Sequence, residues 1–243
     1  MIFESAGFVF KAPPAITRAR RVLIKPSAAY PAAYPVTTSP DFLSGIISGI
    51  RQVTDADIVI LESAADGGPI YPVYQALSYD FPRVLLLDVN DSILVEVDNP
   101  LSRPLAVPTF WVPNVVLSSD YLISVTPLKV IDDISHLSIM NVLTLLPAGK
   151  YSDKKHGAWG ALYSLGINQV AADLYFTLPF DLGIIEARQK FSSPEDPVHG
   201  RVEEWGKIFV GEPYRVDYEA SETLGLKTEY LDLIKEVGAG VEK

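Results

Sequence analysis

Hydrophobic runs that end on a charged side chain recur along the first half of the chain. Residues 21–25 (RVLIK), 57–62 (DIVILE) and 83–88 (RVLLLD) are such runs, and a fourth (YLISVTPLK) begins at 121 and reaches a lysine at 129. Short continuous runs of branched aliphatic residues are typical of strands buried on both faces of a parallel sheet. We therefore predict strands at 21–25, 57–62, 83–88 and 121–125.

Helical periodicity and capping residues occur between and after these runs. Helices are predicted near 40–50, 73–77, 136–146, 159–176, 213–224 and 229–237, and further strands at 182–186 and 207–210. Pro40 suits the first turn of its helix, and Gly225 suits the position after the end of another. The alternation predicts an α/β fold, with a mainly parallel sheet flanked by helices on both faces.

Two proline-rich segments interrupt this regular pattern. Residues 26–40 contain four prolines and two tyrosines, which predicts a long loop acting as a lid or a surface wrap. Residues 93–98 alternate apolar with acidic side chains, and prolines recur from 100 to 113. We predict an irregular or antiparallel edge excursion around 93–114.

Length and charge restrict the function classes. The chain has 243 residues, 48% of them hydrophobic, and its formal net charge is −10. We expect one α/β domain over 1–243, with a frayed tail at 238–243. Because the net charge is negative, nucleic acid and anionic membrane surfaces are unfavourable partners. Small molecules and proteins, including a second copy of the chain, fit this charge better.

The absence of cysteine removes several kinds of chemistry. With no cysteine in the sequence, disulfides, thiolate nucleophiles and iron–sulfur clusters are excluded from this chain. No apolar run reaches the length of a membrane helix, and the N-terminus does not have the pattern of a signal peptide. We expect a soluble cytoplasmic protein.

A series of segments resembles one known family. In chain order these are VLIKPS, TTSPDFL, VILES, LISVTPLK, MNVLTLLP with KKHG, LGIIEA and PVHGRVEEWGKIFVGEPYRVDYEASETLGL. They resemble the uncharacterised family called domain of unknown function 362, over nearly the whole chain. The last segment is the most specific, with a strand, a Gly-Glu-Pro turn, and a helix that contains Val-Asp and is closed by glycine.

The resemblance implies a set of site residues, and this copy departs from the family pattern at several of them. Lys25 is kept and Glu62-Ser63 match, but Ser27 stands where the family has asparagine. Pro127 and Lys129 stand in the place of two lysines, and Val130 or Ile131 stands in the place of a histidine. Met140 precedes Asn141 where the family has a lysine before asparagine, and Glu186 stands where aspartate is more common. His156, after two lysines, and Asp217 match the family pattern. Many relatives carry an iron–sulfur module, which this chain lacks the cysteines to hold.

The charged strand ends predict a ligand site. The carboxyl ends of parallel strands converge on one crevice, so Lys25, Glu62, Asp88 and Lys129 are expected near one another. Lysine binds phosphate or carboxylate as a compact point charge. Alternatively, each lysine reaches solvent or pairs with a carboxylate. The predicted ligand-binding residues are Lys25, Glu62, Ser63, Lys129 and Asn141.

Catalytic and metal-binding candidates complete the predicted site. His156, in a basic loop, is the candidate for proton transfer, and Glu186 is the second catalytic candidate. Glu62 and Asp217 are the candidate ligands of a hard cation such as Mg²⁺. For Asp217, a salt bridge or a charge facing the helix dipole is the structural alternative. His136 is expected to be a structural group near a helix start.

Two functions are consistent with these residues. The first is an enzyme, or former enzyme, that binds a small anionic metabolite at the strand ends, with or without a divalent cation. The second is a non-catalytic binding or assembly protein that keeps the family scaffold after partial loss of its site. No Rossmann or P-loop signature is present, and the sequence does not name a cofactor.

Overall fold

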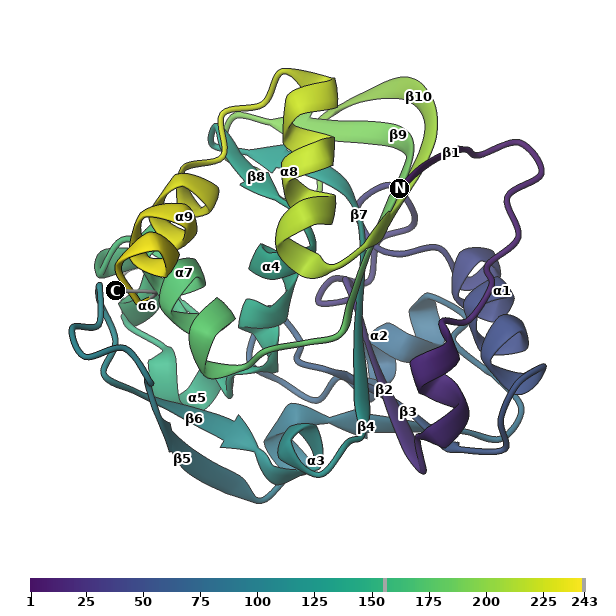
Figure 1. Ribbon diagram of the computed structural model, residues 1–243, viewed down its shortest axis with the longest axis horizontal. Helices are drawn as coiled ribbons and strands as arrows, with labels where there is room; N and C mark the ends of the chain where they lie inside the picture. The colour runs from purple at the N-terminus through teal and green to yellow at the C-terminus, as the bar shows by residue number, and fades with distance from the viewer. Residues whose placement is uncertain (155–156, 242–243) are drawn as a thin grey trace.

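A mixed β-sheet forms the centre of the protein in the computed structural model, which describes residues 1–154 and 157–241 (Figure 1). Within this part of the chain the main sheet has eight strands, in the order β1-β10-β9-β7-β2-β3-β4, with β8 paired to β7. The strands are β1 (Ile2–Glu4), β2 (Arg21–Pro26), β3 (Asp57–Glu62), β4 (Val84–Asp88), β7 (Tyr121–Ile131), β8 (Ile134–His136), β9 (Leu182–Ser193) and β10 (Arg201–Gly211).

The five strands from β4 to β9 run parallel, and this confirms the predicted fold class. The pairs of β3 with β4, β2 with β3, β2 with β7 and β7 with β9 are parallel, whereas β10, β1 and β8 are antiparallel to their neighbours. Successive residues of β2 point to opposite faces, so Leu23 packs in one core cluster and Val22 and Ile24 pack in another. Both faces are therefore buried, as the continuous apolar runs predict.

Helices cover the two faces of the sheet (Figure 1). On one face lie α1 (Pro40–Arg51) and α2 (Tyr71–Ala76), and on the other lie α4 (Ser138–Asn141), α7 (Ile167–Thr177), α8 (Pro213–Leu224) and α9 (Glu229–Val241). The remaining helices are α3 (Asn114–Leu117), α5 (Ala148–Tyr151), α6 (Gly160–Ser164) and the 3₁₀ turns η1 (Pro14–Arg18), η2 (Val89–Asp91) and η3 (Val142–Leu145). The predicted start of α1 is confirmed, because the Ser39 hydroxyl accepts a hydrogen bond from the Phe42 N–H and Pro40 occupies the first turn.

The proline-rich excursion forms a separate small sheet. Strands β5 (Leu94–Asp98) and β6 (Thr109–Pro113) pair antiparallel to each other. Phe110 and Val112 of β6 are buried in the same core cluster as α7 and η3. The antiparallel excursion predicted for residues 93–114 is thus present, and it packs on this core cluster instead of extending the edge of the main sheet.

Strand β7 is longer than the sequence pattern predicts. It continues through Pro127 to Ile131, so Lys129 lies inside the strand and not at its end. Proline lacks the N–H of a regular ladder, and the register between β7 and β9 shifts between Pro127 and Leu128. The irregularity allows the strand to resume and to form a hairpin with β8.

Two predicted helices are also divided. Residues 136–146 contain the end of β8, the single turn α4 and the 3₁₀ turn η3 in place of one continuous helix. The predicted helix at 159–176 is interrupted at Gly166, whose φ of 94° separates α6 from α7. Glycine adopts such a backbone angle at little cost, so this residue marks the break.

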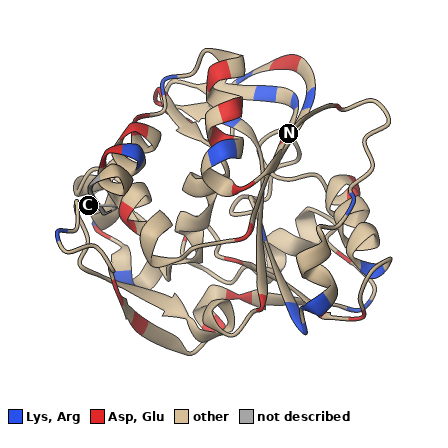
Figure 2. Ribbon diagram, viewed as in Figure 1, with Lys and Arg blue, Asp and Glu red and all other residues tan. Residues whose placement is uncertain are grey.

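Charged residues of both signs are interspersed over the outer elements (Figure 2). In the part of the chain that the structure describes, no helix has the length and apolar character needed to span a membrane.

Candidate functional site

The strand order changes direction at β2, and a cavity lies beside that point. From β2 the chain moves outward through β3 to β4, and it later returns to β7 on the opposite side of β2. Neighbouring parallel strands whose connections lead apart leave a crevice at their carboxyl ends. A cavity of about 480 Å³ is lined there by residues that follow β2 and β3 and by residues of β7, β8 and α4.

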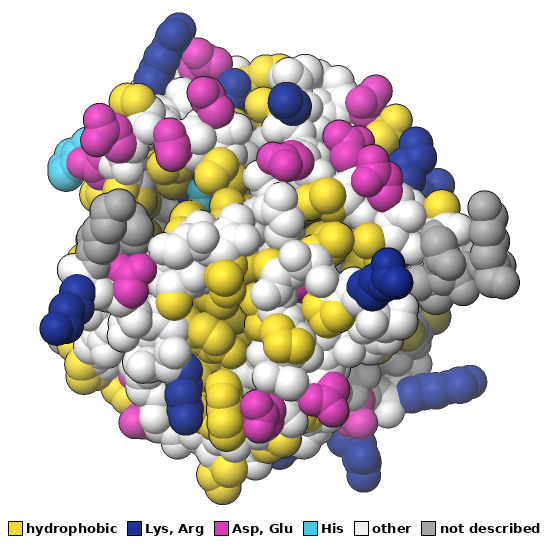
Figure 3. Space-filling view, turned by 90° about the vertical axis from the view of Figure 1, so that its left-hand side faces the viewer, with side chains coloured by type: hydrophobic (Ala, Val, Ile, Leu, Met, Phe, Trp, Pro, Cys, Tyr) yellow, Lys and Arg dark blue, Asp and Glu magenta, His cyan; other side chains and the backbone are white. Residues whose placement is uncertain are grey.

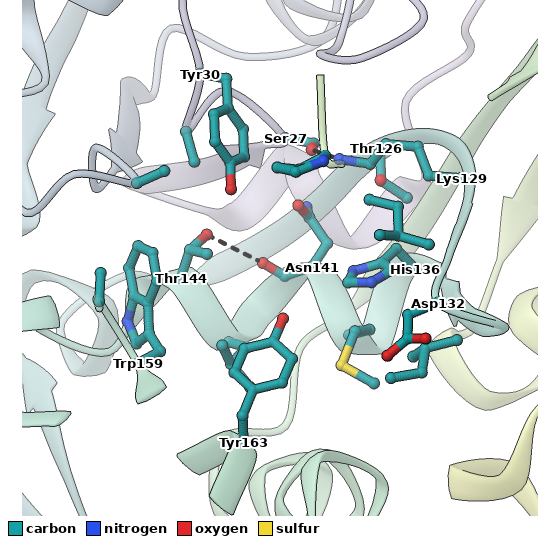
Figure 4. Close-up of a pocket in the computed structure, with 18 of the residues that line it drawn as sticks. Ser27, Tyr30, Thr126, Lys129, Asp132, His136, Asn141, Thr144, Trp159 and Tyr163 are labelled. Atoms are coloured by element: carbon teal, nitrogen blue, oxygen red, sulfur yellow. Dashed lines mark hydrogen bonds between the residues drawn. The ribbon is translucent and has the colours of Figure 1, made fainter. Parts of the chain in front are cut away.

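Both polar and aromatic side chains line the cavity wall (Figure 4). Ser27 and Lys129 lie together at one end, beside Thr126. The aromatic side chains Tyr30, Trp159 and Tyr163 also line the cavity, and Met140 and Leu143 add apolar surface. Figure 3 shows a hollow in the corresponding face of the molecule, bordered by acidic and hydrophobic side chains. Such a wall suits a small ligand that has both an apolar part and a polar group.

Lys25 and Glu62 form a buried ion pair behind the polar wall. Both side chains are 0% exposed, and the Lys25 Nζ lies 2.7 Å from Glu62 Oε2. The Lys25 ammonium also donates to the Pro26 carbonyl at 2.6 Å and to Asn141 Oδ1 at 3.5 Å. Burial lowers the pKa of Lys25, and the Glu62 charge acts in the opposite direction. All three ammonium protons therefore have acceptors within the protein.

The Glu62 carboxylate is equally well provided with donors. Besides Lys25, its Oε2 accepts from the Ala28 N–H at 2.9 Å. Its Oε1 accepts from the Ser63 N–H at 2.9 Å and from the Thr144 hydroxyl at 2.7 Å. Glu62 thus joins the end of β3 to the loop after β2 and to η3, and a metal ion would have to displace some of these donors.

Asn141 connects three elements at the same place. Its Nδ2 donates to the Lys25 carbonyl at 3.1 Å and to the Ser124 Oγ at 3.0 Å. The side chain lines the cavity, and its predicted role in binding a ligand stays a prediction. Through Asn141, the short helix α4 is fixed against β2 and β7.

The Lys129 side chain is bonded differently from those of Lys25 and Glu62. The residue is 8% exposed, lines the cavity, and donates to the Ser27 hydroxyl at 2.7 Å. Among the described residues, no carboxylate lies within ion-pair distance of its ammonium. Burial and then the positive charge of Lys25 lower the pKa of Lys129 to about 8, while Glu62 acts in the opposite direction. Lys129 therefore presents a poorly compensated positive charge to the cavity.

His136 faces Lys129 across the hairpin of β7 and β8. The two residues are paired in the strand register, and both line the cavity. Burial and the Lys129 charge lower the pKa of His136 to about 3, so the imidazole is neutral at neutral pH.

The sequence contains a turn signal from which the position of His136 could have been predicted. Asp132 and Asp133 separate two apolar stretches and have φ angles of 51° and 58°, which are typical of the central residues of a tight hairpin turn. Such a turn folds residues 134–136 back along β7 as a strand. The prediction that residue 136 begins a helix is therefore wrong, and the hairpin sets His136 opposite Lys129.

Glu186 lies outside the cavity wall, in a cluster that holds α1. Its carboxylate accepts from the Ser39 N–H at 3.1 Å and from the Ser39 hydroxyl at 2.7 Å, and it pairs with Arg188. Burial raises the pKa of Glu186, and Arg188 opposes this. These contacts are those of a group that positions the start of a helix, and its catalytic role stays a prediction.

Asp217 is likewise buried away from the cavity wall, at the amino end of α4. Its two oxygens accept from the N–H groups of Ser138 and Ile139, both at 2.9 Å, and from the Tyr230 hydroxyl at 2.8 Å. Burial raises the pKa of Asp217 to about 6 in spite of these donors. Asp217 thus fixes α4, the helix that carries Asn141.

The remaining residues of the predicted site are Ser63, Asp88 and His156. The Ser63 side chain is buried and does not line the cavity, although its N–H binds Glu62. Asp88 accepts from the N–H groups of Ile70 and Asn90 and so orders the loops beside β4. His156 lies outside the described residues.

Metal binding is not supported by a cluster of ligands in the described ranges. Residues 1–154 and 157–241 contain no group of three or more His, Cys, Asp or Glu side chains arranged to hold a metal ion. The Mg²⁺ site at Glu62 and Asp217 stays a prediction from the sequence.

Comparison with solved structures supports the fold. The structure is similar to that of the lactate racemase apoprotein from Thermoanaerobacterium thermosaccharolyticum, with a TM-score of 0.53 at 13% sequence identity. The similarity covers 88% of this chain and 52% of that chain, so this chain spans about half the length of the matched structure. At this identity the likeness establishes a shared fold. Comparison with curated protein sequences gave no match.

The family resemblance of the sequence is confirmed by a direct family match. The family described as Domain of unknown function (DUF362) matches residues 22–221. This range includes β3, β7 and all of β2 but its first residue, the residues that line the cavity, and the part of α8 that carries Asp217. The chain belongs to the DUF362 family.

Proposed function

We propose that the protein binds a small organic anion in this cavity, with the Lys129 ammonium as its counter-ion. The observation that carries the proposal is a buried lysine that faces a cavity and is hydrogen-bonded to a hydroxyl instead of a carboxylate. A buried charge of this kind is costly unless a partner compensates it. A carboxylate ligand would supply that partner.

The charges around Lys129 favour a single negative charge on the ligand. Lys25 and Glu62 neutralise each other, and His136 is neutral. The acidic side chains of Asp132 and Glu195, which also line the cavity, are exposed. A ligand with several negative charges would be repelled by these two residues, whereas a monocarboxylate has one charge to place beside Lys129.

The dimensions and the aromatic wall support a ligand of metabolite size. A volume of about 480 Å³ falls in the range of small-molecule sites. Tyr30, Trp159 and Tyr163 offer flat apolar surfaces, and Thr126 and Thr144 add hydroxyl groups that can orient a ligand. These features support the proposed binding site, and they suit either an enzyme or a non-catalytic binding protein.

A thermal-shift screen tests the proposal. The wild-type protein is heated with short monocarboxylates, dicarboxylates, inorganic phosphate, nucleotides and MgCl₂, each in turn. We expect monocarboxylates to raise the melting temperature and the Lys129→Met variant to lose this response. Lys227→Met, which removes an exposed lysine, is the matched control and should keep it.

Two results would contradict the proposed function. One is a wild-type protein that responds to none of the carboxylates. The other is a response that is equal in the wild type and in Lys129→Met. A response to MgCl₂ alone would instead revive the metal site predicted from the sequence.

A further inference from the structure

The cavity places an amine where it can react with its ligand as well as attract it. We propose that Lys129 forms a Schiff base with the carbonyl carbon of a 2-oxo acid bound in the cavity. This inference rests on the proposed function, because the ligand must first be held as an anion beside Lys129. It adds a covalent step and narrows the ligand class to carboxylates with an adjacent carbonyl group.

The geometry at Lys129 is that of an available nucleophile. A carboxylate paired with a buried lysine favours the charged form of that lysine, as Glu62 does for Lys25 against the larger effect of burial. Lys129 instead donates to the Ser27 hydroxyl, which does not require a positive partner. Its side chain reaches the cavity from β7, a strand of the central sheet, so the amine is presented from a rigid element.

The surroundings of Lys129 favour release of its proton. Burial and the nearby Lys25 charge lower its pKa to about 8, so about a tenth of the ligand-free molecules hold a neutral amine at pH 7, and the attack draws on the neutral form. A lysine beside a second cation in a desolvated pocket is a recognised form of activated amine nucleophile. The acidic groups among the described residues that line the cavity are Glu62, which is paired, and Asp132 and Glu195, which are exposed.

The proposed reaction conserves atoms and charge. The lone pair of the neutral Nζ attacks the ketone carbon, a C–N bond forms, and the π electrons move to the oxygen. A proton passes from nitrogen to that oxygen to give a carbinolamine, which takes up a second proton from solvent and loses water. The product is a protonated imine, and its positive charge remains next to the ligand's own carboxylate.

Neighbouring groups can carry the protons of these transfers. The neutral His136 imidazole lies opposite Lys129 in the hairpin, and the Ser27 hydroxyl is already hydrogen-bonded to Nζ. Both residues line the cavity. Lys25 is a poor competitor for the reaction because its side chain is fully buried and all three of its protons are engaged.

Reductive trapping tests the inference. The full chain is incubated with pyruvate and sodium cyanoborohydride, which reduces the imine to a stable secondary amine, and the product is examined by intact-mass measurement and peptide mapping. We expect one reduced pyruvate per chain, located on Lys129. Lys227→Met should be labelled as the wild type is, whereas Lys129→Met and Lys129→Arg should not be labelled.

The controls separate the covalent step from anion binding. Propionate has the carboxylate but lacks the ketone, so it should slow the labelling by pyruvate and add no mass itself. If pyruvate and propionate bind at Lys129 by calorimetry but no adduct forms, the Schiff base is refuted and the proposed function stands. If neither acid binds, the proposed function fails. Labelling spread over surface lysines, or retained in Lys129→Arg, also refutes the inference.

Discussion

At the scale of single residues, Lys129 is a side chain that lowers the stability of the fold. Its pKa is lowered from 10.5 to about 8, so the folded state holds its proton less tightly than the unfolded state. Lowering a pKa by one corresponds to about 1.4 kcal/mol, so the charged lysine costs the fold on the order of 3 kcal/mol. Lys129 lines the cavity, so this cost is consistent with the binding role that we propose for it.

Replacing this lysine should therefore stabilise the protein. Lys129→Met removes the buried charge and keeps most of the side-chain volume, so we expect the free energy of unfolding at pH 7 to rise, by up to about 3 kcal/mol. Urea denaturation of both proteins measures the difference. In the wild type, stability should also increase as pH rises from about 8 towards 10.5, since the folded state releases the proton first. A marked loss of stability in Lys129→Met would show that the lysine is a structural group.

The same titration should control ligand affinity. An anion needs the charged form of Lys129, so affinity for a monocarboxylate should be constant below pH 7 and fall about tenfold per pH unit well above pH 8. The pKa of His136, at about 3, keeps that residue neutral throughout this range. Calorimetric titrations from pH 6 to pH 10 measure the dependence. In Lys129→Arg the charge persists, and any remaining binding should lose its pH dependence; an unchanged profile in that variant would assign the transition to another group.

At the scale of secondary-structure elements, the site depends on the placement of α4. Asp217 of α8 binds the first two N–H groups of the Ser138–Asn141 turn, and Asn141 at its other end binds β2. A helix of one turn has almost no stability of its own and is held by such contacts. The carboxylate on α8 thus positions an amide that lies in the cavity wall.

Removal of this carboxylate should affect both stability and binding. Asp217→Ala leaves the donors of Ser138, Ile139 and Tyr230 without their partner, so we expect a loss of about 3 kcal/mol or more in unfolding free energy and a weaker affinity for the ligand. Asp173→Ala is the matched control, because Asp173 accepts from N–H groups at 105–107 and does not line the cavity. Asp173→Ala should lose stability and keep its affinity for the ligand. The affinity of each variant is measured below its unfolding temperature. If Asp217→Ala and Asp173→Ala changed the affinity equally, the positioning role of Asp217 would be contradicted.

The elements also show which parts of the fold can be predicted from sequence. Lys25, Glu62 and Asp88 lie at or next to the ends of β2, β3 and β4 as their apolar runs predict, because each run stops where the chain becomes polar. The sequence pattern predicts a strand end at Lys129 as well, but the irregularity at Pro127 depends on pairing with β9, which is distant in sequence. Local patterns do not record such pairings.

For the candidate site, residues could be predicted more reliably than their roles. Lys25, Glu62, Lys129 and Asn141 come together, but hydrogen bonding satisfies the first two inside the protein and leaves Lys129 facing the cavity. The aromatic wall at Trp159 and Tyr163 could not be foreseen, since it depends on how α6 folds against the cavity. Which group each buried charge contacts depends on the tertiary structure.

At the scale of the whole molecule, topology and net charge act on the ligand in opposite ways. The direction change at β2 creates a concave site at the strand ends, and Lys129 gives that site a local positive charge. The chain as a whole carries a net charge of −10, and charges of both signs are spread over its outer elements (Figure 2). An approaching anion therefore meets a repulsive field at long range and an attractive charge at short range.

These opposite effects predict an unusual salt dependence of the rate at which the ligand binds. Because added salt screens the long-range repulsion more than the buried contact, the association rate constant of a monocarboxylate should rise, about two- to threefold, from low to physiological ionic strength. Stopped-flow tryptophan fluorescence is a suitable method, since Trp159 lines the cavity, and Trp159→Phe identifies its share of the signal. A rate constant that falls with salt would indicate that the ligand enters through a locally positive region.

Binding of an anion by Lys129 in this cavity is tested most directly by calorimetric titration of pyruvate into the purified chain at pH 7. We expect saturable binding to one site per chain, affinity at least about tenfold weaker in Lys129→Met, and unchanged affinity in Lys227→Met. Absence of binding by the wild type, or the same affinity in Lys129→Met as in the wild type, would contradict the role of Lys129.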